Sequence, residues 1–362
     1  MAIVGGGGWT LEACADVTRF LATYDLPAAC TFRRQDIIDN THPNYVGDLS
    51  PGSNPALLER VRKSDLLLVI GSRLDEISTQ RYTLIDAPVP RQILIHVHPD
   101  SDVLGSVYQT QLPIQSGMPG FAAAAAGLAG ADGAQAWAEW RAAARADYEE
   151  ALIPSPYDGD LDLGRCMVWL RENLPDDAII AIDGGNFSAW PMRFLTWRQP
   201  RTQLAPQAGA MGACAPAAVA ASLLRPDRLV LGFAGDGGFM MTCQEMATAV
   251  QYGATPIYMV FDNGMFGTIR MYQEREHPRR TIGSALLNPD FAALARAYGA
   301  HGKTVARTEE FMPAFERARD SAKCALIHLK MDPEVITTRA SLGEIRDAAL
   351  AKAKRVLERN SG

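Results

Sequence analysis

The sequence lacks the features that mark disulfide-linked, zinc-scaffolded and membrane-spanning proteins. Its six cysteines are scattered along 362 residues and form no CxxC pair, which excludes a disulfide framework or a paired-cysteine zinc site. No apolar run approaches the ~18 residues that a membrane-spanning helix needs. The N-terminus also shows no signal-peptide pattern. These absences predict free thiols in a cytoplasmic protein with no membrane partner.

Excess positive charge is also absent. The chain has 35 Lys and Arg against 41 Asp and Glu, a net charge of −6, and no basic cluster, so a nucleic-acid partner is not expected. Of six histidines only His96 and His98 are closely spaced. They alternate within QILIHVH and share one face of a predicted strand, which is more typical of structural or surface residues than of zinc ligands.

The order of apolar and amphipathic runs predicts an α/β protein built from two doubly wound parallel-sheet domains. We place the first domain at residues 1–150 and the second at 151–362, near the linker PSPYDGD. The first domain opens with a strand, AIV, followed by Gly5–Gly8 and a helix. This glycine run lacks the spacing GxGxxG, and a helix-capping turn explains it equally well, so it gives no support for bound FAD.

The second domain contains one strand–helix–strand unit that places two polar residues together. RLVLGFA (228–234) and PIYMVF (256–261) are expected to be buried strands, with helical spacing over 242–252 between them. Strands joined in this way run parallel. Asp236 and Asn263 therefore follow the carboxyl ends of two strands, on the sheet edge where such folds bind ligands.

These two residues suit a magnesium–diphosphate site. The Asp236 carboxylate and the Asn263 amide oxygen are hard ligands that leave positions on Mg²⁺ for phosphate oxygens. Gly235, Gly237 and Gly238 let backbone amides approach an anion closely. Either motif taken alone favours a polar turn, because such turns are common at strand ends. Their joint position on one sheet edge favours the metal site.

Gly-Asp-Gly, 25 further residues and then Asn resembles the thiamine diphosphate motif of the acetolactate synthase family. Benzoylformate and pyruvate decarboxylases are its relatives. The resemblance implies that the side chains of Asp236 and Asn263 and the carbonyl of Met265 bind Mg²⁺. It also implies a cofactor, thiamine diphosphate, and a central domain that carries FAD in acetolactate synthase.

Two upstream motifs extend the resemblance. Gly209–Gly212 is similar to the family's Gly-x-Met-Gly turn, in which Met211 would wedge under the cofactor and the Gly209 carbonyl would receive its amino group. Asp183–Phe187 stands where the family has Asp-x-Gly-Gln-His contacting diphosphate. The resemblance implies that the following residues contact the cofactor: Asn186, Phe187, Gly209, Ala210, Met211, Gly235, Asp236, Gly237, Gly238, Asn263, Gly264, Met265, Phe266 and Gly267.

The implied activity is decarboxylation or C–C ligation of small 2-oxo acids. Two departures bear on it. Asp262 stands where relatives usually have an Asn, although that position is not a metal ligand. Tyr272 replaces a Trp that acetolactate synthases place near the incoming 2-oxo acid, which weighs against acetolactate synthesis.

Relatives also carry an amino-terminal pyrimidine-binding domain with the glutamate that activates the cofactor, and we expect this domain to be absent here. Glu245 is the nearest acid in this chain, and we expect it to face solvent or another helix. The sequence therefore predicts a homo-oligomer or a separate pyrimidine-binding subunit. A catalytically silent cofactor-binding remnant or scaffold is an alternative, as is a flavin or nicotinamide oxidoreductase.

Overall fold

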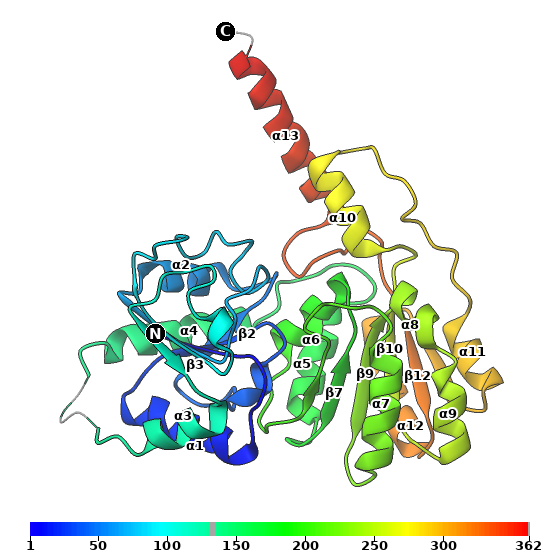
Figure 1. The fold of residues 1–362 in the computed structure, drawn as a ribbon. Helices are drawn as coiled ribbons and strands as arrows, with labels where there is room; N and C mark the ends of the chain where they lie inside the picture. The colour runs from blue at the N-terminus through cyan, green and yellow to red at the C-terminus, as the bar shows by residue number, and fades with distance from the viewer. Residues whose placement is uncertain (131–132, 134, 361–362) are drawn as a thin grey trace. The chain divides into compact units, whose positions relative to one another are not determined.

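The computed structural model describes residues 1–130, 133 and 135–360, which form two compact units (Figure 1). The first unit comprises Met1–Ile153 with Thr196–Gln203, and the second comprises Pro154–Leu195 with Leu204–Gly362. Each unit is built on a six-stranded sheet with flanking helices, and the strand pairs run parallel. The expected α/β class with two doubly wound parallel sheets is confirmed.

The sheet of the first unit has the strand order β3-β2-β1-β4-β5-β6. Helices α1 and α3 pack on one face and α2 on the other, while α4 contributes Tyr148 to the first core cluster and Ala144 to the second. Successive strand residues point to opposite faces, so Val4 joins the α1 side and Ile3 the α2 side. The elements are β1 Ala2–Val4, α1 Leu11–Thr23, β2 Ala28–Thr31, β3 Tyr45–Leu49, α2 Pro55–Lys63, β4 Leu66–Ile70, β5 Ile93–His98, β6 Leu112–Gln115, α3 Met118–Ala126 and α4 Ala138–Ala151.

The glycine run after β1 has a packing role. Gly6 has a φ of +71°, and a Cβ built there would lie 1.8 Å from the Gly71 carbonyl oxygen. Trp9 closes the turn by donating its Nε1–H to the Gly5 carbonyl over 2.8 Å. Close approach of β1 to the end of β4 therefore accounts for glycine at this position, without a bound dinucleotide.

The sheet of the second unit has the order β11-β12-β10-β9-β7-β8. Helices α7, α9 and α11 bury one of its faces in a single core cluster. The elements are α5 Leu163–Asn173, β7 Ile179–Ile182, α6 Ala189–Phe194, β8 Gln203–Leu204, α7 Cys214–Leu224, β9 Val230–Gly235, α8 Asp236–Thr242, α9 Glu245–Tyr252, β10 Ile257–Asp262, α10 Gly267–Glu276, α11 Phe291–Ala297, β11 His301–Val305, α12 Thr308–Asp320, β12 Ala325–Lys330 and α13 Leu342–Asn360.

The helix expected over 242–252 is found as α9, Glu245–Tyr252, and a further helix that was not expected precedes it. Helix α8 starts at Asp236, directly after β9, and α9 follows at Glu245. Two glycines in the first turn of α8 lower its intrinsic helix propensity, so tertiary packing overrides the local signal. The early start draws the chain tightly around the carboxyl end of β9.

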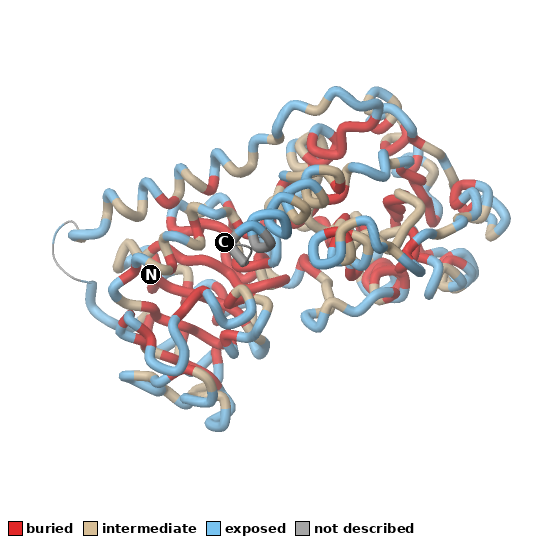
Figure 2. The backbone as a smooth tube through the Cα atoms, turned by 90° about the horizontal axis from the view of Figure 1, so that it is seen from above, coloured by how far each residue is buried: buried red, intermediate tan, exposed pale blue. Residues whose placement is uncertain are grey.

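Most residues of the sheet strands are buried, whereas many described residues of the C-terminal helix are exposed (Figure 2). Strand β10 is buried throughout, whereas residues 351–355 of α13 are all exposed. Among the described side chains of α13, Leu342 and Ile345 near its start pack against Met271 of α10 and Ile336. No helix in the described part of the chain combines the length and apolarity that crossing a membrane requires.

The glycine run offers a matched pair of substitutions. Gly6→Ala should destabilise the protein by about 2 kcal/mol or more, because it combines left-handed backbone strain with a clash. Gly7→Ala should change stability by less than about 1 kcal/mol, since no heavy atom lies within 4 Å of its Cβ position. Urea unfolding measures both, and equal losses would contradict the packing explanation.

Candidate functional site

The predicted site lies at the carboxyl ends of three neighbouring strands. Strands β7, β9 and β10 are adjacent, and the chain reverses direction across the sheet between β7 and β9, a position where α/β sheets form a crevice. An open pocket of about 530 Å³ lies there. It is lined by Gly184, Gly185, Asn186, Phe187, Trp190, Met211, Gly235, Asp236, Gly237, Gly238, Phe261, Asn263, Met265, Phe266, Gly267, Thr268, Ile269, Met331, Val335 and Ile336.

Most of the residues expected to contact the cofactor therefore share one pocket. The lining omits Gly209, Ala210 and Gly264. Gly264 instead donates its backbone N–H to two carboxylates, those of Asp236 and Asp262, over 3.0 and 3.1 Å. The family resemblance placed Gly264 among the residues that contact the cofactor, whereas in the structure its N–H supports the two carboxylates.

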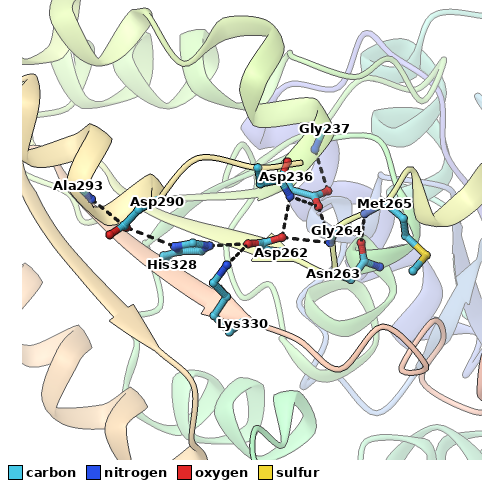
Figure 3. A network of polar contacts seen from close by, with 11 residues as sticks. Asp236, Gly237, Asp262, Asn263, Gly264, Met265, Asp290, Ala293, His328 and Lys330 are labelled. Carbon is cyan, nitrogen blue, oxygen red and sulfur yellow. Dashed lines mark hydrogen bonds and ion pairs between the residues drawn. The ribbon is translucent and has the colours of Figure 1, made fainter. Parts of the chain in front are cut away.

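Asp236 is buried and almost fully hydrogen-bonded (Figure 3). Its Oδ1 accepts the Gly237 N–H over 2.8 Å, and its Oδ2 accepts Gly264 N–H and Asn288 Nδ2 over 3.0 and 2.7 Å. A carboxylate oxygen has two lone pairs, so Oδ1 retains one acceptor position. That position is available to a cation.

Asn263 and Met265 complete the predicted metal-binding group. The Asn263 Oδ1 accepts the Met265 N–H over 3.2 Å, and both residues line the pocket. The amide oxygen retains a second lone pair. One carboxylate, one amide oxygen and one backbone carbonyl suit a hard divalent cation such as Mg²⁺ whose remaining ligands come from water or phosphate. The described residues contain no cluster of three His, Cys, Asp or Glu side chains that could hold a metal ion.

A second carboxylate, Asp262, lies at the end of β10 and is balanced by β12 (Figure 3). Its Oδ2 contacts His328 Nε2 at 2.8 Å and Lys330 Nζ at 2.6 Å. Its Oδ1 accepts Gly264 N–H and Asn288 Nδ2. Burial acts to raise the pKa of Asp262, but the hydrogen bonds from His328, Lys330 and Asn288 prevail and hold it well below its usual value. Asp262 is therefore a charged member of a balanced network.

Sequence reasoning missed Asn288, His328 and Lys330. His328 and Lys330 alternate in ALIHLK, and Lys330 is in register with Asp262. Two polar residues at period two in an otherwise apolar strand are a detectable signal. Asn288 comes from an irregular segment, and no local pattern marks it.

Two residues singled out from the sequence lie outside the pocket lining. Glu245 begins α9 and accepts a hydrogen bond from Thr248 Oγ1 over 3.0 Å. Tyr272 is partly exposed on α10, where the Arg275 guanidinium lies 5.0 Å from its ring centroid. Among the described residues that line the pocket, Asp236 is the one acid.

Comparison with known families and proteins gives matches over both units. The profile "Thiamine pyrophosphate enzyme, central domain" matches residues 1–124, and "Thiamine pyrophosphate enzyme, C-terminal TPP binding domain" matches residues 183–329. The second match begins at Asp183, directly after β7, and includes the ends of β9 and β10 and the residues that hydrogen-bond to Asp236.

Curated relatives are similar over most of this chain. The acetolactate synthase isozyme 2 large subunit of Escherichia coli (strain K12) is 27% identical over 335 residues, which is 92% of this chain and 60% of that protein. Sulfoacetaldehyde acetyltransferase of Castellaniella defragrans is 26% identical over 99% of this chain and 64% of its own length. The acetolactate synthase large subunit of Parasynechococcus marenigrum (strain WH8102) is 30% identical over 84% and 49%. The chain thus spans about half to two thirds of these relatives.

The environment of Asp236 generates a pH prediction. Burial raises the pKa of this carboxyl from 3.8 to about 6. The folded chain then holds a proton that the unfolded chain releases between these pH values, so the free energy of unfolding should fall as pH rises from about 4 to 6, by at most about 3 kcal/mol. Asp262 has the opposite effect at lower pH. Its pKa is lowered in the folded chain, so the stability it contributes is lost only as pH falls below 3.8.

Urea unfolding of the metal-free chain between pH 4 and 7 measures this slope. Asp236→Ala should flatten the profile in that window, because it removes the group that takes up the proton. Gly264 and Asn288 keep Asp262 as their acceptor in this variant. An unchanged slope in Asp236→Ala would show that another group titrates there.

Proposed function

This chain belongs to the thiamine pyrophosphate enzymes, and from that premise we propose that it binds thiamine diphosphate through Mg²⁺ and acts on 2-oxo acids. The reaction type is decarboxylation or C–C ligation, as in an acetolactate synthase-like enzyme. One observation carries the proposal. Asp236 and Asn263, 27 positions apart, converge with Met265 on one pocket inside the matched cofactor-binding domain.

The protein's part in metal binding follows from its oxygen donors. Asp236 Oδ1, Asn263 Oδ1 and the Met265 carbonyl would hold Mg²⁺, and diphosphate oxygens would complete its coordination. Burial penalises the charged form of Asp236, which raises its pKa to about 6. A cation at this carboxylate relieves that penalty, so metal binding and deprotonation are coupled.

The remaining lining supports a ring-bearing cofactor. The Phe187, Trp190, Phe266 and Ile336 side chains give apolar walls that exclude water. Met211 lines the same pocket and is 37% exposed, as a residue that contacts a ligand should be. When bound, thiamine diphosphate supplies the carbon nucleophile and electron sink for chemistry at a 2-oxo acid.

Activation of the cofactor needs a carboxylic acid that this pocket does not contribute. Asp236, the one acid among the described lining residues, is committed to the metal, and Glu245 lies outside. We propose that a pyrimidine-binding domain supplies the acid. It would come from elsewhere in a longer protein, within the same copy or a second copy of that protein, or from a separate subunit.

Thiamine diphosphate binding should depend on Mg²⁺ and on Asp236. Asp236→Ala should weaken binding by more than about 100-fold, beyond the 10- to 100-fold cost of losing a group that only supports a ligand. Asp227→Ala is the control, since Asp227 is an exposed acid paired with Arg225. Calorimetry with Mg²⁺ and with EDTA measures the affinities, and equal binding in EDTA would refute the metal site.

The chain of 362 residues should not activate the cofactor by itself. General acid–base assistance is worth about 10²–10⁴ in rate, and no acid besides Asp236 lines the described pocket. We expect the C2 proton of thiamine diphosphate to exchange within about tenfold of the free-cofactor rate, followed by NMR in D₂O. Acceleration by orders of magnitude would place an activating acid within these residues and overturn the need for a further domain.

A further inference from the structure

We propose that Asp183 is a positioning residue that fixes the turn Gly209–Gly212 and thereby holds Met211 in the cofactor pocket. The turn is called the Met211 turn below. The inference deepens the proposed function and rests on it, because it assigns to Asp183 a part in binding thiamine diphosphate without contact to that molecule.

The Asp183 carboxylate is fully buried directly after β7, where it accepts hydrogen bonds from the backbone N–H groups of the two residues that follow Met211. Its Oδ2 accepts the Gly212 N–H over 2.9 Å, and its Oδ1 accepts the Ala213 N–H over 3.0 Å. Ala213 caps α7, whose first amides have no partner within the helix. A carboxylate at that end is also favoured by the helix dipole. Asp183 therefore joins β7, the Met211 turn and α7 at one point.

Glycines allow this close arrangement. A Cβ at Gly238 of α8 would lie 2.4 Å from Asp183 Oδ2, and a Cβ at Gly184 would lie 2.1 Å from the Gly209 carbonyl oxygen. Neither space is open to a larger residue without moving the turn. Gly238 and Gly184 thus leave room for the contacts between Asp183 and the Met211 turn, and both also line the pocket.

A second anchor acts on the same turn from α8. Thr242 donates its Oγ1–H to the Gly212 carbonyl over 2.9 Å. Gly212 is consequently held through its N–H by Asp183 and through its carbonyl by Thr242. Both of its backbone polar groups point to side chains, so the turn has one defined position.

Met211 needs such an anchor because its own side chain cannot supply rigidity. Methionine is unbranched and has three rotatable bonds, so its ability to support a ring depends on where its backbone is held. Met211 lines the pocket, whereas Asp183 and the neighbours Gly209 and Ala210 do not. Asp183 therefore acts on the pocket through Met211.

Two probes separate this effect from a general loss of structure. Calorimetry with Mg²⁺ compares thiamine diphosphate with inorganic diphosphate, which lacks the rings that Met211 would support. Asp183→Asn should weaken thiamine diphosphate binding about 10- to 100-fold, the range of one hydrogen bond to a charged group. Diphosphate affinity should change by less than about threefold, within the context dependence of a single contact.

Met211→Ala should likewise weaken binding of thiamine diphosphate and leave the affinity for inorganic diphosphate nearly unchanged. In the double variant Asp183→Asn/Met211→Ala the losses should not add, because both substitutions remove one support. Thr242→Val should weaken thiamine diphosphate binding in the same direction, while Thr242→Ser keeps the hydroxyl and should bind as the unaltered chain does. If Asp183→Asn does not fold, the comparison of Thr242→Val with Thr242→Ser still tests the inference.

Amide hydrogen exchange at Gly212 and Ala213 in the cofactor-free chain gives a readout that needs no ligand. Asp183→Asn should speed exchange at both amides, since each loses its charged acceptor. Equal weakening of both probes, additive losses with Met211→Ala, or unchanged exchange would overturn the inference. If the unaltered chain binds no thiamine diphosphate, the proposed function fails, while exchange still decides whether Asp183 anchors the turn.

Discussion

The polar centre of the second unit depends on two N–H donors that two carboxylates share. Gly264 N–H and Asn288 Nδ2 each contact both Asp236 and Asp262. Two buried carboxylates repel one another, and shared donors together with an adjacent cation, Lys330, offset that repulsion. The adjacent strands β9 and β10 can then each have an acidic residue at the carboxyl end, Asp236 after β9 and Asp262 in β10. The pocket wall that contains Asn263 follows from this arrangement.

Charge at Asp262 is balanced across the sheet and not by the pocket. A neutral Asn at this position would require neither Lys330 nor His328, both of which β12 supplies in register with β10. Asp262 faces this network, so its negative charge is neutralised on the side away from Asn263 (Figure 3). The charge of Asp262 is thus balanced by residues 66 and 68 positions along the chain.

The fold class and the convergence of Asp236 and Asn263 on one pocket followed from the sequence, because each strand and each polar strand end has a local signal. Apolar runs such as RLVLGFA mark buried strands, and Gly-Asp-Gly with its distant Asn marks two adjacent strand ends. The start of α8 at Asp236 did not follow, because glycine opposes helix formation and only tertiary packing reveals the gain. Asn288 was also beyond reach, since its contact with Asp236 spans 52 residues without a pattern. Strands and polar strand ends can be predicted from one sequence, whereas a contact such as that of Asn288 with Asp236 cannot.

A short antiparallel bridge near the pocket fixes both ends of the segment that contains α10. Met265 pairs with Ala285, with hydrogen bonds from Phe266 N to Ser284 O and from Leu286 N to Gly264 O. Helix α10 and the segment to Gly283 therefore form a closed excursion whose two ends are fixed. The entropy of closing such a loop rises slowly with its length. Thr268 and Ile269 line the pocket from this excursion, so insertions or exchanges there can reshape one wall of the pocket while Asp236 and Asn263 stay in place.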